Sequence, residues 1–352
     1  MILVINPGST STKVALYDGT SEVAAQSIQH SAEQLARYAH VPDQLEMRTE
    51  AVAEFLAQYH VEMAGLEAIM ARGGLIHPVA AGVYRVNAAM LHDCNEGAVH
   101  EHASNLGAMI ADRLARGTSV RCYIADPVAV DEFDDIARVS GLKELPRQSL
   151  LHALNVRRVA FKVARAHGKE LGEMNMVVAH LGGGLSIVPL RHGRMVDVNN
   201  ADDGGPYSPE RAGGMPPISL VQLSFAEGAT EESVTRQLIH AGGLVSHLGT
   251  NSAREVEQRI AAGDALASLV FEGMAYQIAK EIGAMATVLE GDVDVIVITG
   301  GLANSTMLVE WITRRVGFIA PVEVVPGEDE LDALNDAFLR LKQGTEVEKV
   351  YQ

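Results

Sequence analysis

Two segments of the chain place small or polar residues between apolar runs, and these tips could bind phosphate. Residues 2–17 read ILVINPGSTSTKVALY, in which the turn residues Asn6-Pro7-Gly8 precede four consecutive hydroxyl residues and Lys13. The pattern predicts a β-hairpin. Hydroxyls, backbone N–H groups and a cation at its tip would suit phosphate oxygens. The tip is not a P-loop, because G-x-x-x-x-G-K-[ST] occurs nowhere in the chain.

A second segment, residues 176–190, repeats this arrangement as MVVAHLGGGLSIVPL, with three glycines at its tip. Asn6 aligns with His180 and Gly8 with Gly182 at one constant separation, which is close to half the length of the chain. Two similar hairpins, one opening each half, indicate an internal duplication. Chance similarity between two hairpins of a common type is the alternative.

Further candidate residues lie at strand ends or in glycine-rich turns. They are Arg72 before Gly73-Gly74, Asp126 after the apolar run 120–125, His152 at the start of a helical segment, Arg211 in the Gly- and Pro-rich loop 199–217, and Gly300-Gly301 after the apolar run 293–298. Each also has a plainer explanation as a surface arginine, a helix cap, a structural histidine or a tight turn. Strand ends of α/β sheets collect functional groups, so their shared placement favours a functional role.

The elements that position these residues alternate between apolar strands and helical segments in two series. This alternation predicts an α/β chain with two domains, and 352 residues are enough for two cores. Residues 145–149 are polar and hinge-like, and 152–167 predict an amphipathic helix. We therefore expect domains at 1–148 and 149–326.

The composition limits the classes of partner. The chain is 47% hydrophobic and 21% charged, with a net charge of −17, which argues against a nucleic-acid or anionic-membrane surface. The isolated Cys94 and Cys122 fit a reducing compartment. No charged leader precedes the first apolar strand, and no run of eighteen apolar residues occurs. We expect a cytoplasmic protein without nucleic-acid or membrane partners.

Six motifs together resemble the acetate kinase family and, within it, the butyrate kinases. They are NPGSTSTK at 6–13, ARGG at 71–74, HLGGGLS at 180–186, GGPYSPERAGGMPP at 204–217, ITGGLANS at 298–305 and PGEDEL at 326–331. The resemblance covers essentially the whole chain. It implies an α/β fold of two duplicated ribonuclease-H-like domains, of the actin-like ATPase type, flanking a nucleotide cleft. In that fold the last helix usually returns to the first domain, which implies that residues 327–352 pack there.

The activity implied by the resemblance is reversible phosphoryl transfer between ATP and butyrate or a branched short-chain acid, giving butanoyl phosphate or its analogue and ADP. Magnesium and a homodimer or higher homo-oligomer are implied as well. A carboxylate with a pKa of ~4–5 is already ionised at pH 7 and needs no general base. The difficulty is to bring two anions together and to stabilise charge on the transferred group. An acetate or propionate kinase, or a non-catalytic ATP-binding regulator of actin-like fold, remains an alternative.

The resemblance also implies catalytic roles. Arg72 and Arg211 would clamp the carboxylate and the phosphoryl oxygens. His152 would donate a hydrogen bond to the transferring group. Asp126 would orient Arg211 or the hydrated magnesium ion, and Asn6 and Asp126 are the predicted metal-site residues.

Nucleotide-binding roles follow from the same motifs. The first hairpin would hold phosphates and metal through Asn6, Ser9, Ser11 and Lys13. The second would approach the β-phosphate through His180, Gly182, Gly183 and Gly184. The adenosine would lie by Gly300, Gly301, Asn304 and Arg254.

Two departures from the acetate kinase pattern concern the metal shell. Gly183 stands where acetate kinases carry asparagine, and residues 302–305 (LANS) stand where they carry G-E-N-S. The glutamate of that motif is therefore missing. Water ligands would then replace the missing carboxylate around magnesium.

Leu151, directly before His152, stands where acetate kinases usually carry phenylalanine. The smaller side chain predicts a roomier acyl pocket. Leu151→Phe should therefore shift the preference from butyrate toward acetate, by about tenfold or more in relative kcat/KM. Trapping the acyl phosphate as hydroxamate across acetate, propionate, butyrate, isobutyrate and valerate measures the shift. An unchanged chain-length preference would reject the pocket assignment.

Overall fold

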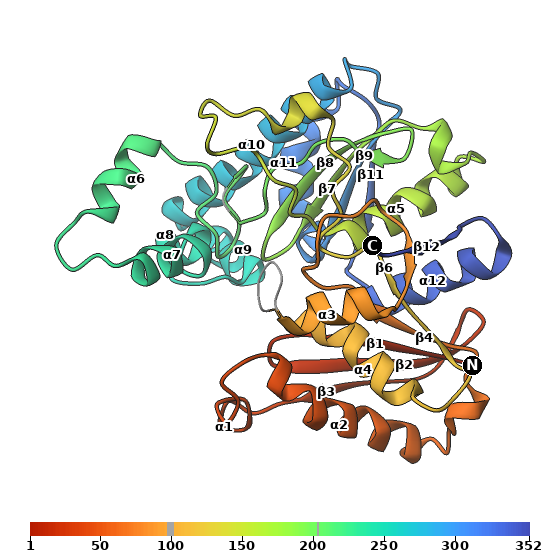
Figure 1. The fold of residues 1–352 in the computed structure, drawn as a ribbon. Coiled ribbons are helices and arrows are strands. Elements are labelled where there is room, and N and C mark those ends of the chain that lie inside the picture. The colour runs from red at the N-terminus through yellow and green to blue at the C-terminus, as the bar shows by residue number, and fades with distance from the viewer. Residues whose placement is uncertain (97–101, 203) are drawn as a thin grey trace. The chain divides into compact units, whose positions relative to one another are not determined.

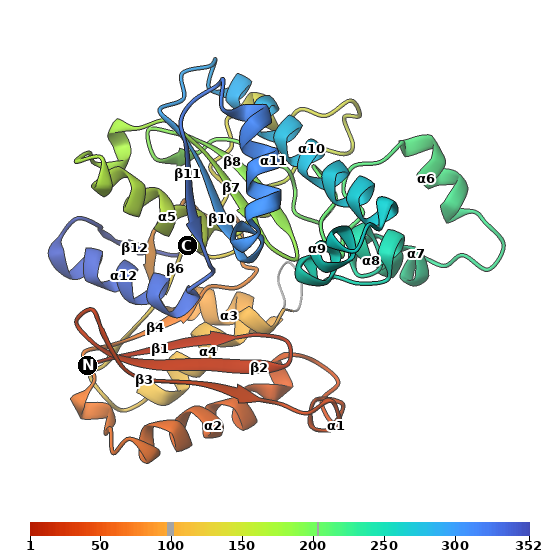
Figure 2. The same cartoon turned by 180° about the vertical axis from the view of Figure 1, so that it is seen from behind.

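The computed structural model describes residues 1–96, 102–202 and 204–352, which form two compact units. The first unit comprises Met1–Asp131 together with Asp329–Gln352, and the second comprises Glu132–Glu328. Each unit contains one β-sheet with helices packed on both faces (Figures 1 and 2). The C-terminal residues thus group with the first unit.

The first unit is built on a seven-stranded sheet in the order β12-β5-β6-β4-β1-β2-β3. Its strands are β1 (Ile2–Pro7), β2 (Ser11–Asp18), β3 (Ser21–Gln29), β4 (Ala68–Arg72), β5 (Val83–Arg85), β6 (Arg121–Ala125) and β12 (Glu348–Val350). Strand β1 runs antiparallel to β2 and parallel to β4, and β4 runs parallel to β6. Every residue of β1 is buried, as expected for a central strand covered on both faces.

The helices of the first unit are α1 (Ala32–Leu35), α2 (Leu45–Gln58), α3 (Ala88–Glu96), α4 (Leu106–Ala115) and α12 (Glu330–Gln343). Helix α4 packs on β1, β4 and β6, with α2 and α3 beside it. Helix α12 packs on the opposite face of the sheet (Figure 2), so the end of the chain closes this core.

The second unit is built on a five-stranded sheet in the order β11-β10-β7-β8-β9. Its strands are β7 (Met176–Leu181), β8 (Leu185–Arg191), β9 (Arg194–Met195), β10 (Val295–Gly300) and β11 (Val322–Pro326). Helix α5 (Ala153–Ala166) covers one face, while α10 (Ala265–Val288), with α11 (Thr306–Val316) beside it, covers the other. Among the described helices none is both long and apolar enough to cross a membrane.

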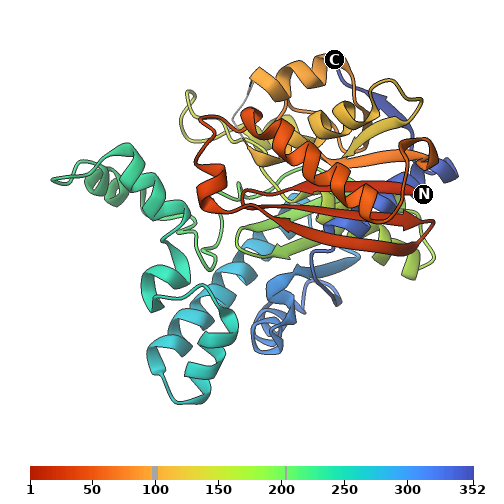
Figure 3. The same cartoon turned by 90° about the horizontal axis from the view of Figure 1, so that it is seen from below.

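Four further helices follow β9 in the second unit: α6 (Pro217–Ser224), α7 (Glu231–Ile239), α8 (Gly243–Leu248) and α9 (Ala253–Ala261). Helices α8 and α9 pack against α10. Helices α6 and α7 pack on each other and extend away from the sheet of this unit (Figure 3). Neither of them contains a buried residue.

The two sheets share a central pattern. In both, an antiparallel hairpin is flanked by a parallel strand, giving β4-β1-β2-β3 in the first sheet and β10-β7-β8-β9 in the second. The hairpins β1–β2 and β7–β8 are the two segments that the sequence aligned. This correspondence supports an internal duplication.

The division between the units differs from the boundary expected near residue 148. Residues 132–148 belong to the second unit. The backbone N–H of Asp134 donates to the Val196 carbonyl at 3.1 Å, and the Arg147 guanidinium pairs with Asp197 at 2.8 Å. Polarity alone suggested a hinge at 145–149, but these bonds fasten the segment to the residues that follow β9 in the second unit.

Gly107 allows α4 to approach the end of β4. A Cβ atom at this position would lie 2.4 Å from the Arg72 carbonyl oxygen and 3.3 Å from the Ala71 Cβ. Both neighbours belong to a buried strand and cannot move independently of the sheet. The helix therefore needs glycine here in spite of glycine's low helix propensity.

Gly107→Ala should lower the free energy of unfolding by about 1–3 kcal/mol, because the added methyl overpacks the contact between α4 and β4. Gly283→Ala is the matched control, since Gly283 also lies inside a helix and its Cβ would meet nothing within 4 Å. That substitution should stabilise the protein by about 0.5–1 kcal/mol. Thermal and urea unfolding followed by circular dichroism measure both effects, and stabilisation by both substitutions would contradict the contact.

Candidate functional site

Three predicted residues of the first unit lie at the carboxyl ends of adjacent parallel strands. Asn6 is near the end of β1, Arg72 ends β4, and Asp126 directly follows β6. The register pairs Ile5 with Ala71 and Arg72 with Ala125, so the three positions follow one another along one edge of the sheet. This edge is where open α/β sheets bind ligands.

Arg72 and Asn6 contact each other and also Glu330, the first residue of α12. The Arg72 guanidinium lies 2.7 Å from the Glu330 carboxylate and 3.5 Å from Asn6 Oδ1, and Asn6 Nδ2 donates to Glu330. Arg72 and Glu330 are 25% and 20% exposed, so solvent and ligands reach both. The cluster presents one cation and several oxygen ligands at a single place.

Asp126 is buried and has an unusual backbone. Its φ is +39°, which is uncommon for a residue with a side chain, and its Oδ1 accepts a hydrogen bond from the Gly82 N–H at 2.7 Å. Backbone strain of this kind costs about 1–3 kcal/mol and clusters at functional sites. The structure thus places Asp126 in a strained turn at the end of β6, held by Gly82.

The tip of the first hairpin carries the predicted hydroxyls and lysine. Ser9 is exposed, Ser11 is half-buried, and Lys13 is exposed at the start of β2. Lys13 lies directly opposite Asn6 in the β1–β2 register, so the two side chains leave the same face of the sheet.

In the second unit, His180 belongs to β7 and leads into the glycine tip. Its Nδ1 lies 2.8 Å from Asn155 Nδ2 on α5. Because an amide nitrogen is a donor, Nδ1 must accept, and the proton of neutral His180 is on Nε2. Nε2 is buried without a hydrogen-bond partner, and it lies 3.4 Å from the Glu328 carboxylate. The buried Nε2–H of His180 therefore lies near the Glu328 carboxylate but is not hydrogen-bonded to it.

His152 precedes α5 and stacks on His180. The ring centroids are 4.1 Å apart with an interplanar angle of 13°, and His152 Nδ1 lies 2.9 Å from the Ser186 hydroxyl. Ser186 is the β8 partner of His180 in the strand register. His152 and His180 thus form one stacked pair, of which His180 belongs to the second hairpin and His152 directly precedes α5.

Arg211 is seated against the glycine tip. Its guanidinium lies 2.8 Å from the Asp202 carboxylate and donates to the Ala201 carbonyl at 2.6 Å. A Cβ on Gly184 would lie 2.4 Å from Arg211 Nη1, so a side chain there would displace the guanidinium from its present position. The Gly183 carbonyl accepts a hydrogen bond from Ser208 of the same loop.

The predicted adenosine-side residues gather at the turn after β10. The Gly301 N–H faces the Glu328 carboxylate at 3.3 Å, and the Asn304 amide donates to the Gly301 carbonyl at 3.0 Å. The Ser305 hydroxyl donates to Glu257 of α9, the helix whose first turn carries the exposed Arg254. Gly300, which ends β10, completes the group.

Sequence reasoning missed Glu328 and Glu330, which contact the glycine tip and Arg72 respectively. Both belong to the PGEDEL segment, where acidic residues follow a Pro-Gly turn and precede a helix. Among the described residues no group of three or more His, Cys, Asp and Glu side chains could hold a metal by itself. Mg²⁺ does not need such a cage, because it binds one or two carboxylates together with water and substrate phosphates.

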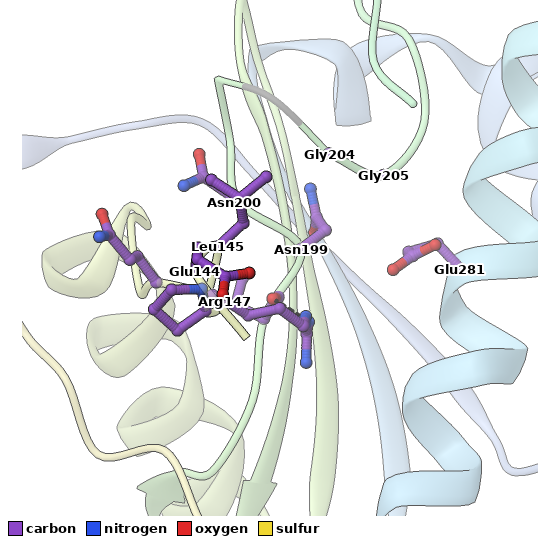
Figure 4. Close-up of a pocket in the computed structure, with 11 residues that line it drawn as sticks. Glu144, Leu145, Arg147, Asn199, Asn200, Gly204, Gly205 and Glu281 are labelled. Carbon is purple, nitrogen blue, oxygen red and sulfur yellow. Dashed lines mark hydrogen bonds between the residues drawn. The ribbon is translucent and has the colours of Figure 1, made fainter. Parts of the chain in front are cut away.

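A cavity of about 700 Å³ lies elsewhere in the second unit (Figure 4). It is lined by Glu144, Leu145, Pro146, Arg147, Gln148, Val198, Asn199, Asn200, Gly204, Gly205 and Glu281. Glu281 projects from α10 toward Asn199 and Arg147, and burial raises its pKa while the Arg147 charge acts in the opposite direction. Arg147 is already bound to Asp197 and the Val198 carbonyl, and no predicted site residue lines the cavity.

The fold is that of short-chain acid kinases. The crystal structure of Porphyromonas gingivalis acetate kinase superposes with a TM-score of 0.80 at 19% identity, covering 97% of this chain and 99% of that one. A propionate kinase from Francisella tularensis subsp. tularensis superposes with a TM-score of 0.75 at 19% identity, covering 95% and 98%. The predicted α/β, actin-like ATPase fold class is thereby confirmed.

The chain belongs to the acetokinase family. The model of that family matches residues 145–325. Over 350 residues the chain is 51% identical to the probable butyrate kinase 2 of Caldanaerobacter subterraneus subsp. tengcongensis, covering 99% of each. It is 42% identical over 352 residues to butyrate kinase 2 of Clostridium acetobutylicum, covering 100% of this chain and 99% of that protein. The predicted family is confirmed, whereas the role of each site residue stays a prediction.

Gly184→Ala tests whether the close approach of the Arg211 guanidinium to the glycine tip matters for activity. The methyl group would displace the guanidinium from the glycine tip, so we expect kcat/KM for ATP to fall about 10²-fold, as for other displaced catalytic groups. Gly141→Ala is the control, since an added methyl there meets nothing within 4 Å. Steady-state kinetics combined with thermal unfolding separate lost activity from lost folding. Wild-type kinetics in folded Gly184→Ala would contradict the assignment.

Proposed function

We propose that the protein transfers the γ-phosphoryl group of ATP to butyrate or a branched short-chain carboxylate, reversibly, forming an acyl phosphate and ADP. Membership of the acetokinase family supports this class of reaction. The main observation that supports it concerns two arginines, Arg72 and Arg211. Each pairs with a single carboxylate and lies beside one of the two predicted phosphate-binding hairpins. A reaction between two anions needs such arginines more than it needs a base.

The acid substrate would bind as a carboxylate. Its pKa of ~4–5 makes it a nucleophile at neutral pH without proton abstraction. Arg72 and Arg211 are suited to clamp it and the phosphoryl oxygens, because a guanidinium binds oxygen anions bidentately. Each would exchange its present partner, Glu330 or Asp202, for an oxygen of the substrates.

The phosphates would be held by hydroxyls and N–H groups. Ser9, Ser11 and Lys13 of the first tip supply two hydroxyls and a cation. The second tip would supply the backbone N–H groups of Gly183 and Gly184, because the Gly182 N–H already donates to the Gly184 carbonyl. The His180 Nε2–H would be a further donor to the phosphates. The stacked His152 would donate to the transferring group, while Gly300, Gly301, Asn304 and Arg254 would contact adenosine.

The Asn6–Glu330 pair fits Mg²⁺, because both residues offer oxygen ligands of the type that this ion prefers. We propose Asn6 and Asp126 as residues of the metal site, with Glu330 as its carboxylate. Bound magnesium would neutralise charge on the nucleotide phosphates. Arg72, next to Glu330, would contribute a fixed positive charge at the same place.

The acid preference is a narrower proposal. Leu151 is 2% exposed and directly precedes His152, so its size would affect the space beside the stacked histidines. The two full-length relatives are named as butyrate kinases, which supports butyrate over the alternatives of acetate or propionate. A non-catalytic regulator would not need the arginine pair.

The remaining proposals concern location and assembly. The buried thiols of Cys94 and Cys122 are free, which supports a reducing, cytoplasmic compartment. A homodimer or higher homo-oligomer is supported by apolar side chains on and after α6, with Ile218 72% and Phe225 86% exposed.

Arg72→Ala and Arg211→Ala should each lower the rate of acyl phosphate formation by about 10³-fold, because each removes a charge that stabilises the transferred group. Hydroxamate trapping with butyrate and ATP measures the rate. Arg113→Ala and Arg315→Ala are matched controls, because these arginines pair with Glu46 and Glu272 on the surface of each unit. The proposed function fails if both active-site variants keep the wild-type rate.

A further inference from the structure

Arg48 is a fully buried arginine in α2, with a relative exposure of 0%. No carboxylate of the described residues lies within ion-pair distance of it. Burial lowers its pKa from the usual value, and no neighbouring charge contributes. An arginine nevertheless stays protonated inside proteins. The first unit therefore contains a buried positive charge without a counter-ion.

The hydrogen bonds of Arg48 run to the tip of the first hairpin. Its Nη1 donates to the Gly8 carbonyl at 2.9 Å, the Ser11 carbonyl at 3.1 Å and the Thr12 hydroxyl at 3.0 Å. Its Nη2 donates to the Ser9 carbonyl at 3.1 Å. Gln44, one turn earlier, accepts from Nε and Nη2 and fixes the plane of the guanidinium.

These bonds decide which groups of the tip face outward. The carbonyls of Gly8, Ser9 and Ser11 point to Arg48, and the Thr10 carbonyl accepts from the His30 N–H at 2.8 Å. All four carbonyl oxygens of the tip are thus satisfied inside the unit. The N–H groups of Ser9 and Thr10 donate to none of the described residues, so they are available to a ligand.

Thr12 connects Arg48 with His30. The Thr12 hydroxyl accepts from Arg48, so its proton is free to go to His30 Nε2, which lies 2.9 Å away. Burial and, to a smaller extent, the Arg48 charge lower the pKa of His30 and keep its ring neutral. The support beneath the tip is therefore a connected network that runs from Gln44 through Arg48 and Thr12 to His30.

The network carries an energetic cost that a purely structural role does not explain. A buried charge without an ion partner loses several kcal/mol of hydration on the order-of-magnitude scale for such groups. An apolar residue at this position of α2 would extend the core formed by Val52, Phe55 and Leu56. What the cation adds is a fixed tip conformation and a positive charge directly beneath it.

We propose that Arg48 is a positioning residue of the kinase reaction: it turns the carbonyl oxygens of Gly8, Ser9 and Ser11 inward, so that the N–H groups and hydroxyls of the tip meet the ATP phosphates. The inference rests on the proposed function of the first hairpin as a phosphate-binding element. It adds a residue that touches no substrate and acts through the backbone of the tip.

Arg48→Ala should lower kcat/KM for ATP about 10²-fold, the scale expected when phosphate contacts are misplaced by about 1 Å. The KM for butyrate should change little, because Arg48 does not contact the groups proposed to bind it. Added ethylguanidinium should occupy the vacated space and raise the kcat/KM of Arg48→Ala for ATP about tenfold. Ethylammonium should not raise it, because it lacks the planar guanidinium group. Absence of this selective rescue overturns the proposal.

Two further variants control for folding. Arg340→Ala removes another buried arginine of the same unit, one that pairs with Glu346, and it should lower thermal stability without raising the KM for ATP. Arg48→Lys retains the charge but cannot span the four tip acceptors. Should Arg48→Ala fail to fold, Arg48→Lys must show a KM for ATP raised about tenfold at unchanged KM for butyrate. Equal changes for both substrates, or none, overturn the proposal.

A readout without substrates separates this inference from the proposed function. The amides of Gly8 and His30 donate to the Ser11 and Thr10 carbonyls, so their hydrogen exchange reports on the tip. Arg48→Lys should accelerate their exchange at least about tenfold, and Arg340→Ala should not. Wild-type protein without acyl phosphate formation would refute the kinase function alone, whereas unchanged exchange in Arg48→Lys would refute the positioning role alone.

Discussion

A loop that binds phosphate must turn its carbonyl oxygens away from the ligand, because both carry negative charge. The two hairpins of this protein meet that constraint in different ways. In the second tip, the Gly182 N–H donates to the Gly184 carbonyl at 3.2 Å, and Ser208 donates to the Gly183 carbonyl. In the first tip, the charged Arg48 collects three carbonyls at once. The orientation of each tip is thus fixed before any ligand arrives.

The positive charges of the site obey a related constraint in a chain with a net charge of −17. Arg72 is held by Glu330 and Arg211 by Asp202, and all four side chains remain 20–40% exposed. Ion pairs with this much solvent contribute only about 0–1 kcal/mol. Exchange of a carboxylate partner for a substrate oxygen is therefore inexpensive. The acidic partners order the arginines, yet in the proposed reaction substrate oxygens could still replace them.

Much of the fold could be predicted because its signals are local. The apolar runs that became β1, β2, β7 and β8, and the turns between them, are each specified within about ten residues. Two features that depend on distant contacts could not be predicted. Glu330 meets Asn6 only after α12 has returned to the first sheet, and the segment 132–148 joins the second unit through Val196 and Asp197. Neither partner can be identified from local pattern.

Arg48 was missed for another reason. It lies one turn before Val52 on the apolar stripe of α2, a position where periodicity predicts a core residue. A charged residue on such a stripe usually indicates an error of register or an exposed edge. Here Arg48 faces polar backbone, because the carbonyl groups of the first tip pack against this side of α2. A cation at a core position of a helix therefore indicates buried carbonyl acceptors nearby, here those of the first tip.

The difference between the tips also limits how far the duplicated halves are interchangeable. Glycines without Cβ atoms let the Arg211 guanidinium and the Glu328 carboxylate approach the second tip directly. The first tip carries side chains at Ser9, Thr10 and Ser11, which supply hydroxyls but prevent an equally close approach from outside. It can be supported only from the inner side, where Arg48 lies. In the proposed reaction, the same hairpin topology would thus give one tip that binds through side chains and another that binds through backbone. The arginine beside each tip lies on the side that its residues leave open.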